Sequence, residues 1–151
     1  MGDLQIRAAK PGDEEAIFQL IRGLGEYEKL SHEITGTSQL LREHLFGEKT
    51  FAEAVLATSR ETPVGFALFF YNYSTFLTKP GVHLEDLFVL PEHRGKGIGK
   101  SLLTKVESIA RERGCGRLEW SVLDWNEPAI AFYKKYGAEV LPDWRICRVV
   151  L

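Results

Sequence analysis

The sequence predicts an α/β fold, with a mixed central sheet of about seven strands flanked by about four helices. Short apolar segments alternate with amphipathic segments along most of the chain, which is typical of strands and helices in one layered domain. Segment 63–73 is apolar on both of its faces, as expected for a central strand that helices cover on both sides. Segment 83–90 leads through a glycine-rich turn into a helix and then a strand at 117–123, so these two strands are expected to be parallel and right-handed in their crossover.

The first half of the chain is expected to contain three strands and two helices. They are a strand at 4–8, a helix over 14–24, a helix from near Thr37 or Ser38 to Gly47, and strands at 51–58 and 63–73. Asp13 is the expected cap of the first helix, because a carboxylate can accept from free amides in the first turn. A polar turn separates the last two strands, which predicts that they pair as a hairpin.

The second half is expected to contain two more helices and four more strands. They are the strand 83–90, a helix from Ile98 to the Gly114–Gly116 turn, the strand 117–123, a helix from Asn126 to Gly137, and short strands at 139–141 and 146–151. Apolar residues four, four and three positions apart predict the long helix. Asn126 as the cap and Pro128 in the first turn are typical of a helix start, and Gly137 is typical of a helix end.

Composition narrows the class of protein. The length suits one domain over residues 1–151, and 44% apolar with 26% charged residues is ordinary for a globular protein. A formal charge of −2 provides no overall field for nucleic acid or an acidic membrane, so neither is expected as a partner. The longest apolar run, 64–71, is too short to span a bilayer, and the first residues lack a signal region.

Cysteine and histidine usage points away from disulfide and metal chemistry. Cys115 and Cys147 are unclustered, so a reducing, cytoplasmic environment is expected. The four histidines show no metal-ligand spacing, and no metal is expected.

The segment 94–100 predicts a binding site for phosphate groups. Glycines at every second position leave the backbone open, and the first amides of the following helix have no intrahelical partner (Gly95, Gly97 and Gly99). Basic residues add positive charge around the same turn (Arg94, Lys96 and Lys100). A P-loop is excluded, because its first glycine would fall on Arg94, and the dinucleotide-binding spacing also fails. A tight, basic turn without a ligand is the structural alternative.

Glu85 and Asp86 are adjacent carboxylates in an otherwise apolar strand. Successive strand residues face opposite sides, so one carboxylate is expected to face the glycine-rich turn and the other to face away. A buried strand carboxylate is rare unless it is paired or used, which favours a functional role for Glu85. An exposed strand end, or pairing with a buried arginine, is the alternative.

The motif Arg-Gly-Lys-Gly-Ile-Gly at 94–99 resembles the acetyl-CoA pyrophosphate loop of the GCN5-related N-acetyltransferases, the GNAT superfamily. The resemblance extends to segments 6–9, 27–28, 84–89 and 125–133, and within the superfamily it is to the spermidine/spermine branch, which includes diamine and thialysine acetyltransferases. The pattern Asn-x-x-Ala-x-x-Phe-Tyr followed by Gly-Ala, from Asn126 to Ala138, is specific at this distance from the loop.

The resemblance implies a GNAT fold, acetyl-CoA as the co-substrate and roles for named residues. Glu85 is expected to contact the amine through water, and Tyr133 is expected to be the general acid that protonates the coenzyme sulfur. The expected coenzyme-binding residues are Leu87, Phe88, Val89, Arg94, Gly95, Lys96, Gly97, Ile98, Gly99, Lys100, Asn126, Pro128 and Ala129. The expected substrate-binding residues, an acidic and aromatic set suited to a cation, are Tyr27, Glu28, Glu85, Glu119, Trp120 and Ser121.

The sequence therefore predicts an acetyl-CoA-dependent N-acetyltransferase. The expected acceptor is a primary amine of a small polyamine, diamine or lysine-like molecule, which attacks directly in a ternary complex because no Cys–His pairing is evident. Acetylation of protein or peptide amines and a non-catalytic coenzyme A-binding module are the alternatives. A homodimer with the carboxyl-terminal strands at its interface is expected from the resemblance.

Overall fold

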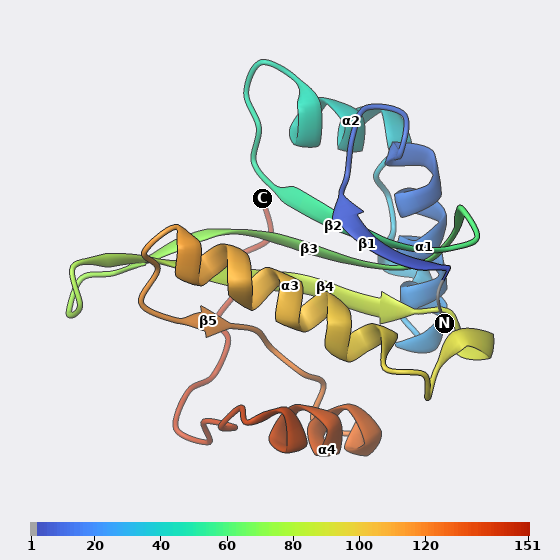
Figure 1. The fold of residues 1–151 in the computed structure, drawn as a ribbon. Coiled ribbons are helices and arrows are strands. Elements are labelled where there is room, and N and C mark those ends of the chain that lie inside the picture. The colour runs from blue at the N-terminus through green and yellow to red at the C-terminus, as the bar shows by residue number, and fades with distance from the viewer. Residues whose placement is uncertain (1–2) are drawn as a thin grey trace. The chain divides into compact units, whose positions relative to one another are not determined.

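The computed structural model describes residues 3–151. The first two residues, which belong to the segment where no signal region is expected, lie outside the described residues. The strands are β1 (Leu4–Ala8), β2 (Glu53–Ser59), β3 (Thr62–Ser74), β4 (Lys79–Val89) and β5 (Leu118–Glu119), and the α-helices are α1 (Glu14–Tyr27), α2 (Ser38–Phe46), α3 (Ile98–Glu112) and α4 (Glu127–Tyr136) (Figure 1). Two short 3-10 turns, η1 (Ser31–Glu33) and η2 (Pro91–His93), complete them. The residues up to Trp120 form one compact unit and Ser121–Leu151 a second, and each is described by itself.

The sheet of the first unit has the strand order β1-β2-β3-β4-β5. The first four strands pair antiparallel with one another, and β2 and β3 form the expected hairpin. β5 pairs with β4 in parallel, which confirms the expected relation of the two strands on either side of α3. The sequence thus predicts the mixed α/β sheet correctly.

The number of strands differs from the prediction of about seven. Within residues 3–151 the sheet contains five strands, the expected strand at 117–123 is reduced to β5, and no strand forms at 139–141 or 146–151. A strand requires a neighbour that shares its backbone hydrogen bonds, and the closing segment has none in this single chain. Its apolar side chains stay exposed, with Trp144 at 79% and Val150 at 86%.

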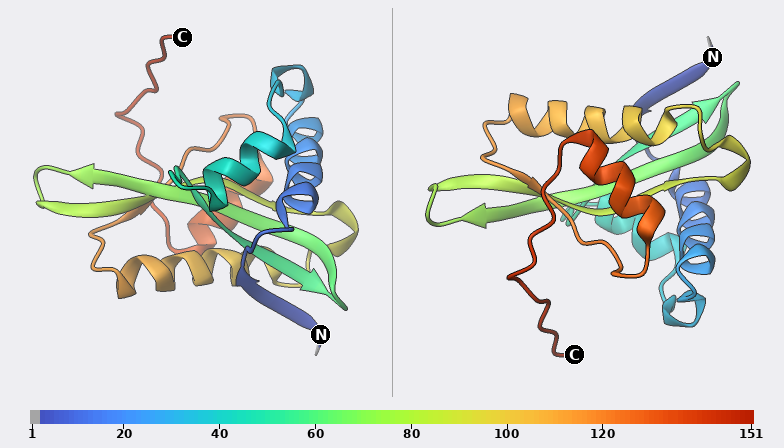
Figure 2. Two further views of the ribbon diagram at one scale, coloured as in Figure 1. Left: turned by 90° about the horizontal axis from the view of Figure 1, so that it is seen from above. Right: turned by 90° about the horizontal axis from the view of Figure 1, so that it is seen from below.

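Helices cover both faces of the sheet in the first unit. α1 and α2 lie on one face and α3 on the other, as Figures 1 and 2 show. Buried side chains from α1, α2 and the facing strands form one cluster, Ile17, Leu20, Leu45, Ala54, Leu56, Phe66, Leu68 and Phe88. On the opposite face, a Cβ on Gly65 would come within 3.3 Å of the Leu102 side chain, so this glycine lets α3 approach the sheet closely.

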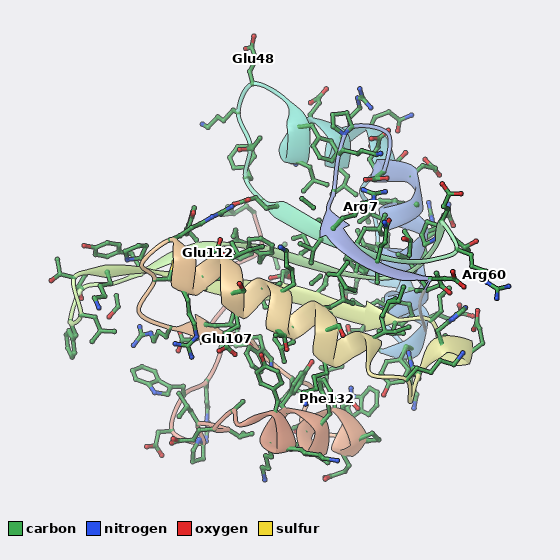
Figure 3. All side chains as sticks on the ribbon, viewed as in Figure 1. Arg7, Glu48, Arg60, Glu107, Glu112 and Phe132 are labelled. Atoms are coloured by element: carbon green, nitrogen blue, oxygen red, sulfur yellow. The ribbon has the colours of Figure 1, made fainter. Side chains whose placement is uncertain are left out.

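The start of α1 differs in detail from the prediction. Asp13 precedes the helix but makes no side-chain cap. Its carboxylate instead accepts two bonds from the Arg7 guanidinium at 2.7 and 3.0 Å and one from the Lys10 amide at 2.8 Å (Arg7 is labelled in Figure 3). These bonds favour the ionised carboxylate, and the Arg7 bond above all lowers the pKa of Asp13. A charged partner on β1 therefore competes successfully with the helix amides for this side chain.

In the described part of the chain, no helix is both long and apolar enough to cross a membrane. Among the same residues, no three or more histidine, cysteine or acidic side chains are grouped so as to hold a metal ion.

Candidate active site

β4 contains one extra residue at Glu85. The register pairs Phe69 of β3 with Leu84 and Leu68 with Asp86, so Glu85 has no opposite residue on β3. Such a β-bulge bends the strand and changes where its backbone groups and side chains point. The backbone groups of β4 therefore point in different directions before and after Glu85.

The bulge turns two main-chain donors toward the uncovered edge of β4. Before it, the Val82 amide donates to Arg117 on the β5 side at 3.0 Å, whereas after it the Leu90 amide donates to Val64 on the β3 side at 2.8 Å. Amides alternate along a strand, so without a bulge both even-numbered residues would point the same way. The reversal leaves the amides of Leu87 and Val89 facing the edge, which β5 does not cover because it pairs with Val82 and His83.

The loop after β4 presents an open backbone to the start of α3. Gly95 and Gly97 have φ angles of 77° and 83°, a region that favours glycine, and Gly97 occupies the cap position without a side-chain cap bond. In the described chain, nothing lies within 4 Å of a Cβ built on either glycine. The first amides of α3 are thus accessible to an anion, and Lys96 and Lys100 are exposed beside them.

Arg94 points back from the loop to the sheet. Its Nε donates to the Val89 carbonyl at 2.9 Å, and its guanidinium lies 4.6 Å from the Tyr27 ring centroid and 5.4 Å from that of Phe88. Cation–π contacts of this kind hold an arginine against aromatic faces. The side chain thereby connects the loop, the end of β4 and Tyr27 at the end of α1.

The expectation that Glu85 and Asp86 face opposite sides is wrong, because the bulge intervenes. Asp86 is paired with Leu68, which packs against α1, and its pKa is raised to about 7 by burial and by the nearby charges of Glu85 and Glu28. Glu28, near the end of α1, has a raised pKa for the same reasons, burial first and then Glu85. The structure thus gathers three carboxylates on the α1 face of the sheet.

Asp86 is a candidate functional residue that the sequence interpretation did not include among the site residues. Its signal was present in the adjacent pair of carboxylates, but alternation assigned only one of them to the site. A raised pKa from burial together with neighbouring like charges is typical of a group that handles protons. The burial expected of Glu85 is wrong, because its side chain is 56% exposed, and Asp86 is the less exposed carboxylate of the pair.

β5 brings further polar side chains to the same edge. Glu119 is paired with His83 across the parallel ladder. Its carboxylate lies 3.4 Å from the Arg117 Nε and accepts a long bond of 3.5 Å from the side-chain Nδ2 of Asn72. Trp120 follows it at the end of the first unit and is half-buried. The expected substrate-binding residues of this unit, Tyr27, Glu28, Glu85, Glu119 and Trp120, thus come from α1, the residue after it, β4, β5 and the residue after β5.

The remaining predicted residues belong to the second unit: Ser121, Asn126, Pro128, Ala129 and Tyr133. Asn126 caps α4 as expected, since its side chain accepts from the Ala129 amide at 3.3 Å. The Tyr133 and Phe132 rings lie 5.4 Å apart, centroid to centroid, and Gly137 ends the helix with a φ angle of 115°. The local signals of the sequence therefore place α4 and its two ends correctly.

A bulged strand with amides on its edge and a glycine loop at a helix start are suited to an extended molecule that carries phosphate groups. Comparison with known proteins identifies the class of protein and its family. Residues 20–138 match the model of the acetyltransferase (GNAT) family, and the chain belongs to this family. Proteins of the family use acetyl-CoA as the co-substrate.

The chain is similar to amine acetyltransferases along almost its whole length. It is 40% identical to thialysine N-epsilon-acetyltransferase of Bos taurus, over 95% of this chain and 88% of the bovine protein. It is 32% identical to L-ornithine N5-acetyltransferase of Arabidopsis thaliana, over 96% of this chain and 83% of that protein. Among solved structures, an aminoglycoside acetyltransferase from an uncultured soil metagenomic sample superposes with a TM-score of 0.83 at 19% identity, over 99% of this chain and 97% of that chain, which shows the shared fold.

Proposed function

We propose that this acetyltransferase transfers an acetyl group from acetyl-CoA to a primary amine of a small diamine, polyamine or lysine-like molecule. The observation that carries this proposal is the bulge of β4. It sets the Leu87 and Val89 amides on the open edge and Glu85 and Asp86 on one face. Backbone amides that can donate hydrogen bonds to an acyl group, and carboxylates that can bind an amine, therefore lie on adjoining parts of one strand.

The backbone supplies the coenzyme side of the proposed site. The amides of Leu87 and Val89 are suited to accept an extended acyl-pantetheine chain along the strand and to stabilise the thioester oxygen as it becomes negative. The loop amides from Gly95 to Gly99, with Lys96 and Lys100, are suited to the diphosphate. Phe88, Arg94 and Ile98 are proposed to contact the coenzyme next to this backbone, and Asn126, Pro128 and Ala129 are proposed to contact it from α4.

The carboxylates supply the amine side. An ammonium has a pKa of about 10.4, so releasing its proton at pH 7 costs roughly 4–5 kcal/mol, at about 1.36 kcal/mol per unit. Glu85 is proposed to contact the amine through water, and Glu28 is proposed to attract the cation. Tyr27, Glu119, Trp120 and Ser121 are proposed to complete the surroundings of the amine. Asp86, whose pKa is raised to about 7, adds a carboxyl group to the same face of the sheet. The amine then attacks the thioester carbon directly, and the C–S bond breaks.

Tyr133 is proposed to donate a proton to the departing thiolate. A phenol has a pKa of about 10 and is therefore protonated at neutral pH. Replacing Tyr133 with Phe removes only the hydroxyl, and turnover is expected to fall at least 10-fold with little change in acetyl-CoA affinity. Tyr136→Phe, in the same helix, is the matched control and should keep its turnover. Equal turnover of Tyr133→Phe and the unchanged chain would remove Tyr133 from the acid role.

The acidic side chains, together with the substrates of the similar acetyltransferases, support the proposed substrate class. Three neighbouring carboxylates suit a substrate with more than one positive charge, such as a diamine or a lysine-like amino acid. We further propose that residues 1–151 act as one N-acetyltransferase domain in the cytoplasm. The exposed apolar segment 139–151 supports a homodimer in which this segment pairs with a second copy.

A thiol-release assay with acetyl-CoA tests the proposed function. Thialysine, ornithine, putrescine, spermidine and a lysine-containing peptide serve as acceptors at equal concentrations. We expect the small amines to react and the peptide to remain unreacted. Activity confined to the peptide would select the protein acetyltransferase alternative, and coenzyme binding with no transfer to any amine would select a coenzyme-binding module.

A further inference from the structure

His83 lies beside Glu85 on the edge of the sheet, and neither the family motifs nor the site residues described above give it a task. Its Nε2 is 3.7 Å from the Glu85 carboxylate, and the two side chains are 29% and 56% exposed, respectively. Its ring stacks at a tilt on Phe70, with centroids 5.1 Å apart and an angle of 31° between the planes. The imidazole thus contacts a side chain of its own strand and one of β3.

The register of the sheet explains why His83 faces the amine side. His83 is paired with Phe70, and Asp86 is paired with Leu68, two residues earlier on β3. Residues two apart on a strand share a face, so His83 and Asp86 both lie on the α1 face of the sheet. The bulge at Glu85 therefore adds His83 to the carboxylates rather than separating it from them.

Acidic groups surround the imidazole. Glu85 approaches it along β4, and Glu119 is its partner across the ladder on β5, with Arg117 beside that carboxylate. From β3 the facing side chain is the uncharged Phe70. From the end of α1, Glu28 interacts electrostatically with Glu85, which helps to raise the pKa of Glu28.

A site built only of carboxylates has a chemical difficulty. Carboxylates hold an ammonium well, but they stabilise its charged form and so oppose the loss of the proton that attack requires. Imidazole is the side chain that ordinarily exchanges a proton near neutral pH. It can therefore remove the proton from the site and pass it to solvent.

We infer that His83 takes up the proton that the amine loses and releases it to water, with Glu85 holding the imidazole in place. His83 has this role only if the chain has the amine acetyltransferase activity proposed above. The N–H bond of the ammonium breaks, directly or through a bridging water, and an N–H bond forms at His83 Nε2. The freed lone pair forms the amide bond, and the proton leaves through the exposed side of the ring.

The test compares two acceptors that differ in their need for a base. Thialysine carries an amine that is mostly protonated at pH 7, whereas 2,2,2-trifluoroethylamine is already neutral at that pH. His83→Phe keeps the ring stacking on Phe70 without a titrating group, and His83→Gln keeps a polar group at the same place. Both variants are expected to lower kcat/KM for thialysine about 10- to 100-fold at pH 7 and to recover as the pH rises toward 10. With trifluoroethylamine both should stay within about two-fold of the unchanged chain.

His44→Phe is the matched control, because His44, on α2, also contacts an aromatic ring, that of Phe51. It should show the unchanged pH profile with both acceptors. An equal loss on both acceptors at every pH, or no loss on either, would overturn the role of His83 while the unchanged chain remains active. If the unchanged chain acetylates no amine, the proposed function itself fails, and the role of His83 fails with it.

Discussion

The residues that follow the carboxyl end of α3 use their backbone amides in hydrogen bonds within the protein. The Cys115 amide donates to Ala110 at 2.9 Å, and the Gly116 amide donates to Pro80 at the start of β4, also at 2.9 Å. At its amino end, the same helix begins at Gly97 without a side-chain cap, next to the half of β4 whose amides face an uncovered edge. Each end of α3 lies next to one end of β4 and is flanked by a glycine with a positive φ angle. The two ends differ in which backbone groups are left free, and the free groups are those that can bind a ligand.

The largest expected effect comes from filling the open end. Gly97→Val adds a side chain where the loop is open, and it should lower acetyl-CoA affinity more than 100-fold because the coenzyme can no longer approach the amides. Gly114→Val is the matched control. Gly97 and Gly114 have φ angles of 83° and 73°, and nothing in the described chain lies within 4 Å of a Cβ on either.

Both substitutions carry the same backbone strain, roughly 1–2 kcal/mol, so both should lower the melting temperature similarly. Isothermal titration with acetyl-CoA separates strain from loss of the site. If Gly114→Val loses as much affinity as Gly97→Val, the difference between the two ends of α3 has no functional meaning.

A smaller effect is expected from removing one donor at the open edge. Leu87→Pro removes an amide that faces away from β3, so the fold should survive while kcat/KM falls about 10-fold or more. Asp86→Pro, one residue earlier, removes an amide directed at β3 and should cost roughly 1–3 kcal/mol of stability for the lost ladder bond. Circular dichroism melting and the thiol-release assay measure the two effects. Unfolding of Leu87→Pro with a stable Asp86→Pro would show that the amides point the other way.

The smallest expected effect is a pH-dependent gain in the stability of the folded protein when Asp86 is replaced by Asn. The pKa of this residue is raised to about 7 in the folded protein, so folding binds a proton that the unfolded chain has already lost. Stability contributed by this group is therefore complete at low pH, falls as the pH rises from about 4 to about 7, and is constant above that. Asp86→Asn removes the penalty, and its melting temperature should exceed that of the unchanged chain by a few degrees at pH 8 and less at pH 5. The same difference at both pH values would contradict the cause given for the raised pKa.

The sequence predicts the local features of the fold well, because each depends on neighbouring residues. The glycine-rich start of α3, the Asn126 cap and the Gly137 end of α4 all follow from short-range chemistry. The parallel pairing of β4 and β5 follows from the helix between them.

Features that depend on distant residues were predicted less well. The bulge depends on the register between β3 and β4, so alternation alone assigned Asp86 to the wrong face. The capping role expected for Asp13 is lost to Arg7 on another element. Segment 139–151 has the composition of strands but pairs with no strand among the residues that the structure describes.

The central claim is that the main-chain amides after the bulge and in the glycine loop bind acetyl-CoA. A titration of the 15N-labelled chain with coenzyme A, followed by amide NMR, tests it most directly. The amides of Leu87, Val89, Gly95 and Gly97 are expected to show the largest shift changes, with Gly114 and Gly116 unaffected. Saturable binding that shifts the carboxyl end of α3 and leaves the glycine loop unchanged would contradict the claim.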